Sequence, residues 1–207
     1  MRYGKEHKLA TRRRIVEAAG RRFKSDGIDG SGVATLMADA GLTNGAFYAH
    51  FESKEDLVAA AVSDQLRGQR ESLETVPPGR AGPEQIVRDY LSPGHRDNPA
   101  EGCPSAALLD EITRCAEPIR KAYTEGLLAI IDDFAARLAP DDPESARTTT
   151  LSVYALMAGT LQLSRALADR RLADDLLERG VQNVLTLLGQ DNGSGPGSQA
   201  HHLDGME

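Results

Sequence analysis

Apolar residues recur at every third or fourth position along most of the chain, and this spacing favours helices over strands. Near the N-terminus the repeat includes Leu9, Ile15, Ala19 and Phe23, which predicts a first helix from about Lys8 to Lys24. The same spacing predicts further helices over about 33–40, 44–50, 53–73, 83–91, 104–115, 118–138, 144–168 and 172–188. Because no segment has a convincing strand pattern, we predict an all-α fold.

Glycine and proline mark the breaks between these helices. Gly27 predicts the end of the first helix and Gly41 the end of the second, which Ser31 can cap. A Pro/Gly-rich stretch at 76–83 predicts a linker, and the polar residues 92–102 predict a loop. The breaks therefore separate a group of short helices from a larger set of long ones.

The charge of the chain is unevenly distributed. Residues 1–25 contain nine basic and two acidic residues, a net charge of +7, whereas the whole chain has −7 and the remainder therefore −14. A basic end on an acidic body favours a polyanion bound at that end, although an Arg-rich helix in water is the alternative. We predict no signal peptide and no membrane span, and the two cysteines fit a reducing cytoplasm.

The first 50 residues have the pattern of a helix-turn-helix, for which a plain three-helix bundle is the alternative. The third helix begins Thr43-Asn44-Gly45-Ala46, and these small side chains leave backbone N–H groups open to a phosphate or a base edge. Glycine near a helix start costs ~1 kcal/mol relative to alanine. A helix built only for packing would not need a glycine at this position. Tyr48 and His50 add to this helix two side chains that end in polar groups. These features favour DNA binding.

The stretch from Leu36 to Leu57, LMADAGLTNGAFYAHFESKEDL, resembles the DNA-binding domain of TetR-family regulators. The family pattern there is AG-[VL]-[ST]-x-G-x-[LFI]-Y-x-[HY]-F-x-[ST]-K-x-x-L, and the resemblance covers about residues 8–58. It implies a helix-turn-helix DNA-binding domain over 1–54 and a helical effector-binding and dimerisation domain over 55–189. A flexible tail over 190–207 follows.

The resemblance also implies roles for individual residues. The implied DNA contacts are Ser31, Thr35, Thr43, Asn44, Gly45, Ala46, Tyr48, His50 and Lys54. Residues 43–46 would begin the recognition helix in the major groove, and Lys54 would hold a phosphate. Ala34 and Ala49 are smaller than the residues frequent at these positions, so we expect few direct base contacts.

The long C-terminal helices are the expected site of dimerisation and effector binding. Residues 151–163 are apolar nearly all round, which predicts two buried faces. The resemblance implies a homodimer through about 147–188, and the core of a monomeric bundle is the alternative. The candidate effector-pocket residues are Leu108, Leu109, Ile112, Tyr123, Leu127, Ile130, Phe134 and Tyr154, each of which could instead be a core residue. The expected effector is a small hydrophobic molecule.

Cys103 is a candidate redox or electrophile sensor. Gly102-Cys103-Pro104 places its thiol at a predicted helix N-cap, where the helix dipole favours a thiolate, although a small buried side chain is the alternative. The sequence has no nucleophile–base pair and no metal-ligand spacing, so we expect neither an enzyme nor a bound cofactor or metal.

We therefore expect a cytoplasmic transcriptional regulator that binds double-stranded DNA. The specific prediction is a repressor that leaves a palindromic operator when an effector binds. Two alternatives remain open at this point: an enzyme or small-molecule carrier whose N-terminal helices are incidental, and an architectural DNA-binding protein without an effector.

Overall fold

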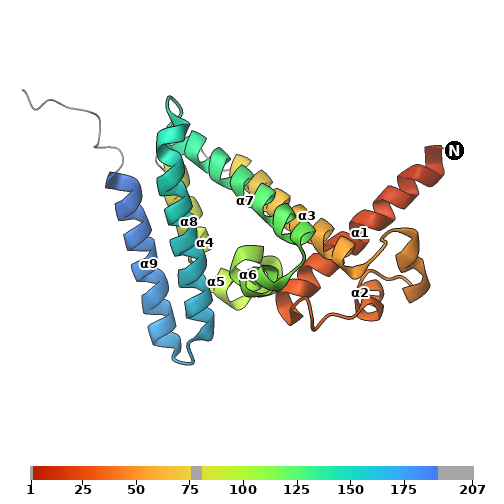
Figure 1. Ribbon diagram of the computed structural model, residues 1–207. Coiled ribbons are helices and arrows are strands. Elements are labelled where there is room, and N and C mark those ends of the chain that lie inside the picture. Colours follow the sequence, from red (N-terminus) through yellow and green to blue (C-terminus); the bar gives the residue numbers. More distant parts are fainter. Residues whose placement is uncertain (1, 76–80, 191–207) are drawn as a thin grey trace, which may run out of the picture.

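The computed structural model describes residues 2–75 and 81–190, which are helical almost throughout (Figure 1). The elements are α1 (Arg2–Asp26), α2 (Val33–Asp39), the 3₁₀ helix η1 (Asn44–Ala49), α3 (Lys54–Glu74), α4 (Ala81–Tyr90), α5 (Pro93–Asp97), the 3₁₀ helix η2 (Pro99–Glu101), α6 (Pro104–Arg114), α7 (Glu117–Leu138), α8 (Pro143–Ala166) and α9 (Arg170–Gln190). No strand occurs within these two ranges, so the predicted all-α fold is confirmed. None of the helices in this part of the chain is long and apolar enough to cross a membrane.

The N-terminal helices close around a core of aromatic and aliphatic side chains. Ile15 and Phe23 of α1, Leu36 of α2, Phe47 of η1 and Phe51 just after η1 are each no more than 2% exposed. Burying side chains of this size stabilises a fold by ~1.5–3 kcal/mol each. This core fixes η1 against α1 and α2.

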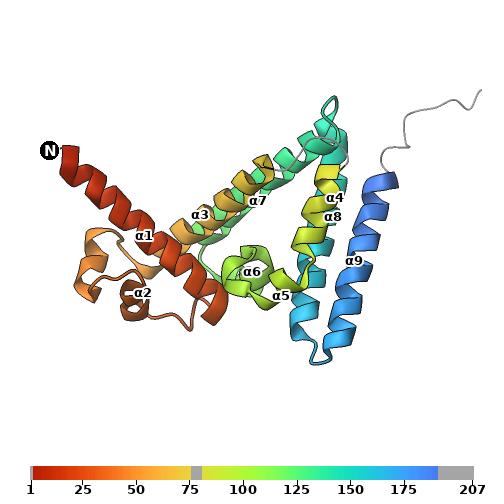
Figure 2. The same ribbon diagram turned by 180° about the vertical axis from the view of Figure 1, so that it is seen from behind.

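Two long helices join this N-terminal group to the rest of the molecule. α3 and α7 lie side by side and run away from α1 (Figures 1 and 2). α8 and α9 form a helix pair at the opposite edge, with α4 against that pair, and α6 lies between α1 and α8. The molecule therefore has the N-terminal helices at one end and the α8–α9 pair at the other.

A second core holds α4, α8 and α9 together. It includes Val87, Leu161 and Val184, none of which is exposed. Gly180 allows a close approach of α9 to α8, because a Cβ added there would lie 2.6 Å from Cγ2 of Thr160. The α8–α9 pair is thus tightly packed within one chain.

The first core does not end where the predicted DNA-binding domain ends. It continues along α3 through Leu57 and Leu66 and reaches Leu108 of α6 and Ile130 of α7. Because α3 begins beside η1 and packs on α7, it belongs to both halves of the structure. The division into domains after residue 54 therefore stays a prediction.

Several predicted boundaries were wrong. α1 begins at Arg2 rather than near Lys8, and the predicted loop at 92–102 contains α5 and η2. These two helices have five and three residues, too short to show a repeat of apolar positions. Residues 81–83 of the predicted linker open α4. Gln190, the first residue of the predicted tail, is the last residue of α9. The rest of the tail, 191–207, and the rest of that linker, 76–80, lie outside the described residues.

One of the two predicted helix caps, at Cys103, is confirmed. Ser53 caps α3 by accepting a hydrogen bond from the Asp56 N–H at 3.1 Å. Cys103 is the N-cap residue of α6, and Pro104 follows it at the first position. The cap predicted at Ser31 is wrong: Gly32 is the N-cap residue of α2, because Ser31 turns inward.

Candidate nucleic-acid interface

η1 presents the residues that the sequence predicted to contact DNA. Thr43, Asn44 and Gly45 are exposed where η1 begins, and Tyr48 is 75% exposed one turn later. Beneath them, Phe47 stacks on Phe51 with ring centroids 5.7 Å apart. The exposed residues therefore stand on a rigid aromatic base.

This base also sets the direction of the exposed tyrosine. The Tyr48 ring meets the edge of the Phe47 ring with centroids 5.2 Å apart, in a T-shaped contact. Ala46 is half-buried and Ala49 is exposed, so a small side chain precedes Phe47 and another follows Tyr48 in the sequence. A partner surface can approach the backbone of η1 closely at these positions.

The two candidates before η1 differ in exposure. Thr35 is exposed on α2. Ser31 is 1% exposed, and its hydroxyl donates a hydrogen bond to the Gly27 carbonyl oxygen at 2.6 Å. This hydroxyl holds the turn after α1, so we leave Ser31 out of the interface that we propose below.

Lys54 and His50 are half-buried beside η1. The Lys54 ammonium donates a hydrogen bond to the Ile28 carbonyl oxygen at 2.6 Å, which ties the start of α3 to the turn after α1. Burial, together with the nearby cations of Lys8 and Arg12, lowers the pKa of His50. His50 is therefore a neutral side chain near neutral pH, with Nδ1 buried and without a hydrogen-bond partner among the described residues.

The basic end of the chain is partly used for internal contacts. Arg22 pairs with Asp39 of α2 and with Asp26, in each case at 2.7 Å. Lys24 is buried and donates to the Gly102 carbonyl oxygen at 2.7 Å, and burial lowers its pKa to about 8. The exposed basic side chains of α1 within the described side chains include Lys5, Lys8, Arg13, Arg14 and Arg21. These keep the N-terminal end positive.

Contacts between α1 and α6 join the N-terminal helices to the C-terminal ones. One Glu111 carboxylate oxygen accepts hydrogen bonds from the Ile28 N–H at 2.7 Å and the Asp29 N–H at 3.3 Å. Lys24 makes the second link through Gly102, at the start of α6. Neither link was predicted from the sequence, because residues about 80 positions apart share no local pattern.

We predict that Glu111→Ala destabilises the protein by about 1–3 kcal/mol, because the Ile28 N–H loses a charged acceptor in a partly buried position. Urea unfolding followed by circular dichroism measures this loss. The matched control is Asp110→Ala, since the Asp110 side chain is 84% exposed and pairs only with Arg114 among the described residues. Its expected effect is below about 0.5 kcal/mol, and equal losses in both variants would contradict the role of Glu111.

The predicted effector-pocket residues divide into two groups. Ile130, Phe134 and Tyr154 line an apolar cavity of about 30 Å³ between α3, α4, α7 and α8. Leu108 and Ile112 are buried in the first core, and Leu109 and Leu127 are half-buried. Tyr123 lies outside the cavity lining, but its hydroxyl and that of Tyr154 each lie 2.9 Å from the Ser105 hydroxyl.

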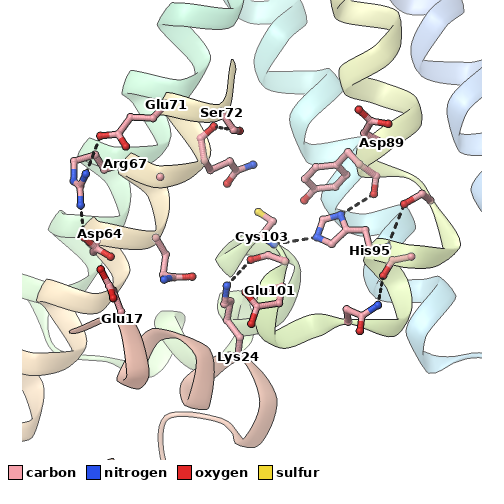
Figure 3. Close-up of a pocket in the computed structure, with 18 of the residues that line it drawn as sticks. Glu17, Lys24, Asp64, Arg67, Glu71, Ser72, Asp89, His95, Glu101 and Cys103 are labelled. Atoms are coloured by element: carbon pink, nitrogen blue, oxygen red, sulfur yellow. Dashed lines mark hydrogen bonds and ion pairs between the residues drawn. The ribbon is translucent and has the colours of Figure 1, made fainter. Parts of the chain in front are cut away.

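A larger groove of about 930 Å³ opens between α1, α3 and the α4–α6 segment (Figure 3). Arg67 and Glu71 of α3 lie on one side of it and His95 on the other, and Lys24 of α1 lies beside Cys103 between them. His95 donates from Nδ1 to the Tyr90 carbonyl oxygen at 2.8 Å and accepts at Nε2 from the Cys103 N–H at 3.0 Å. His95 was not predicted from the sequence, where its only signal was its position in an expected loop.

Cys103 lies at the floor of this groove. It is 5% exposed, and its sulfur lies 3.3 Å from the Tyr154 hydroxyl. The other cysteine, Cys115, is at the far end of α6, and both thiols are free. A sensor role for Cys103 stays a prediction, tested by titrating a protein–DNA complex with an electrophile beside a Cys103→Ser variant.

Comparison with known proteins decides the family. Residues 15–61, which contain η1 and the aromatic pair, match the sequence model described as bacterial regulatory proteins, tetR family. The N-terminal part of the chain therefore belongs to the TetR family. The resemblance found in the sequence is thereby confirmed.

Two curated relatives show how far this similarity extends along the TetR-family chain. The HTH-type transcriptional regulator TtgR of Pseudomonas putida is 38% identical over 80 residues, which are 36% of this chain and 38% of that protein. LmrA of Bacillus subtilis, another HTH-type transcriptional regulator, is 25% identical over 161 residues, 74% of this chain and 86% of that one. The chain thus spans well under half of the first relative and most of the second.

Solved structures share the fold over most of the chain. The reduced form of E. coli NemR superposes with a TM-score of 0.72 at 19% identity, covering 84% of this chain and 95% of that one. A TetR transcriptional regulator from Chloroflexus aurantiacus gives 0.69 at 25% identity, covering 92% and 98%. The helices beyond the matched N-terminal region therefore also have a TetR-like arrangement.

Proposed function

We propose that this TetR-family regulator is a homodimeric repressor that binds a palindromic operator in the cytoplasm and leaves it when a small molecule binds. The observation that carries the proposal is η1: exposed Asn44, Gly45 and Tyr48 stand on buried Phe47 and Phe51. Small and polar side chains on a fixed helix start suit close contact with phosphates and base edges. The exposed basic residues of α1 supply the positive field that attracts DNA.

The proposed DNA contacts are Thr35, Thr43, Asn44, Gly45, Ala46, Tyr48, His50 and Lys54. Asn44 is the candidate base reader, because an asparagine amide can pair bidentately with adenine in the major groove. Lys54 contributes positive charge from a fixed position, since its ammonium is held on Ile28. Tyr48 has a hydroxyl that can reach a phosphate.

The α8–α9 pair is the proposed dimer interface. Leu151 and Leu163 on α8 are 47% and 61% exposed, and Leu172 and Leu187 on α9 are 52% and 37% exposed. Exposed apolar side chains gathered on one helix pair mark an interaction surface. A two-fold axis through this surface would place two copies of η1 on the same side of a duplex.

The contacts between α1 and α6 are the proposed route from effector to DNA. The groove and the apolar cavity are both lined by α3, and the groove is also lined by Lys24 and Gly102. A ligand that displaces α3 or α6 therefore acts on two elements that hold η1 and the turn after α1. Release from DNA follows when the two recognition helices no longer match successive grooves.

We predict that Asn44→Ala changes which base pairs are preferred, with a loss of about 1–3 kcal/mol of discrimination at the base that Asn44 reads. Fluorescence anisotropy on a selected operator and its single-base variants measures this change. Because Asn44 is exposed, the variant should keep the unfolding midpoint of the original protein. The control is Thr113→Ala, an exposed position on α6 that should leave DNA binding unchanged. Unaltered base preference in Asn44→Ala would remove Asn44 from the interface.

A further inference from the structure

Two buried polar atoms on α3 and α4 have no hydrogen-bond partner among the described residues. They are the side-chain amide oxygen of Gln69 on α3 and the hydroxyl of Tyr90 at the end of α4. Tyr90 is only 9% exposed. The thiol of Cys103 contacts the Tyr90 hydroxyl and, after burial as the main cause, raises the pKa of Tyr90. A thiol is a weak hydrogen-bond partner, and the hydroxyl has no well-formed hydrogen bond among the described residues. Unsatisfied groups of this kind are costly and call for a partner.

The neighbouring phenols show that the same region satisfies its other hydroxyls. Tyr123 and Tyr154 both contact the Ser105 hydroxyl at 2.9 Å, and Tyr154 also contacts the Cys103 sulfur at 3.3 Å. The lack of a partner at Tyr90 among the described residues is therefore not a general property of this cluster.

Gln69 and Tyr90 lie where the two hollow spaces meet. Both residues line the open groove, and both line the apolar cavity. On the cavity side their neighbours include Leu73, Phe134 and Met157, and no charged residue is among the described residues that line it. A molecule that reaches this junction therefore has an apolar space ahead of it and two polar atoms beside it.

The groove side argues against an anionic ligand. Its described lining includes five carboxylates and three basic side chains, and the groove therefore carries a net negative charge. Arg67 is already paired with Asp64 and Glu71, and Lys24 is bonded to the Gly102 carbonyl oxygen (Figure 3). A cation would be drawn to the groove, but at the junction it would lose water beside an uncharged amide and a phenol, which is unfavourable.

We propose that the effector is an uncharged molecule with an apolar body and one hydroxyl group, anchored between Gln69 and Tyr90. The hydroxyl donates to the Gln69 amide oxygen and accepts from the Tyr90 hydroxyl, and the apolar body enters the cavity lined by Leu73 and Phe134. This inference rests on the proposed effector function and specifies the chemistry of that ligand.

The size of the cavity connects binding to movement. At about 30 Å³ it is far smaller than ordinary ligand pockets of ~300–1,000 Å³, so an apolar body can enter only if its walls separate. Met157 has a flexible side chain that can move aside, whereas Leu73 belongs to α3 and transmits the displacement to that helix. Binding therefore pushes α3 away from α8, along the route proposed above.

The test measures binding in the absence of DNA, by isothermal titration calorimetry on the full chain with four probes. 4-Propylphenol carries the hydroxyl, and 4-propylanisole replaces it with a methyl ether that cannot donate. 4-Propylbenzoate and 4-propylbenzylammonium carry charged groups. We expect 4-propylphenol to bind about tenfold or more tightly than the other three, as a site built for a hydroxyl should.

Variants assign this preference to the two residues. In Tyr90→Phe and in Gln69→Leu, the ratio between the phenol and the anisole should fall to within about twofold. Tyr123→Phe is the matched control, because it removes a phenol that already has Ser105 as its partner, and it should keep the tenfold ratio. Thermal unfolding of each variant verifies that it is folded. If one of the two variants does not fold, the other still tests the inference.

Several results would overturn the inference. They are an unchanged ratio in both folded variants, a ratio near one in the original protein, tighter binding of either charged probe, or no saturable binding of any probe. The last result would indicate a buried water as the partner of the two atoms. Failure of the proposed function is separate: the phenol would bind with the expected ratio but would not release DNA.

Discussion

Leu163→Glu is expected to convert the proposed dimer into a monomer and to weaken operator binding by at least about a hundredfold. Leu163 on α8 is 61% exposed in one chain, so the substitution should leave the fold intact. In a two-fold interface each copy would bury an unpaired carboxylate, at a cost of several kcal/mol. Loss of the dimer removes the second half-site contact, which accounts for the loss of affinity.

Sedimentation equilibrium at micromolar concentration gives the oligomeric state, and fluorescence anisotropy gives operator affinity. The control is Leu128→Glu, because Leu128 is also exposed, at 37%, but lies on α7. It should remain a dimer with unchanged affinity. If Leu163→Glu stays dimeric, the interface lies on a surface other than the α8–α9 pair.

Phe47→Ala is expected to destabilise the protein by about 3–5 kcal/mol, as for other buried phenylalanines. Phe47 is 1% exposed and stacks on Phe51, so its removal leaves a cavity directly under η1. Stabilities of whole proteins are about 5–15 kcal/mol, and this loss is therefore a large part of the total. Specific DNA binding should disappear, because the exposed residues of η1 lose their support.

Urea unfolding measures the stability of Phe47→Ala. Tyr48→Ala is the matched control, since the adjacent tyrosine is 75% exposed. It should lose less than about 1 kcal/mol of stability while still weakening DNA binding. A loss of similar size in both variants would mean that η1 is not supported by the aromatic pair.

The sequence predicted those parts of the structure that depend on local patterns. The repeat of Leu9, Ile15 and Phe23 predicts α1, and the repeat over 53–73 predicts α3, because apolar faces are set within a few residues. The family followed from η1 and its flanking residues for the same reason. The short helices α5 and η2 have too few residues to show such a pattern.

The contacts that give the candidate site its character connect distant parts of the chain. Ser31 turns inward, Lys54 bonds to Ile28, and Glu111 bonds to the turn after α1. None of these has a local sequence signal, because each depends on how helices pack. The junction at Gln69 and Tyr90 could not be predicted from the sequence for the same reason, since α3 and α4 meet there only in the folded chain.

The central claim is that two copies of η1 read DNA together, and selection of bound duplexes from a random pool tests it most directly. We predict an imperfect palindrome whose half-sites are separated by about 34–36 Å, one helical turn, or by a wider regular spacing set by the dimer. Enrichment should be lost in Phe47→Ala. Recovery of a single asymmetric site, or of no motif at all from the folded protein, would contradict the claim.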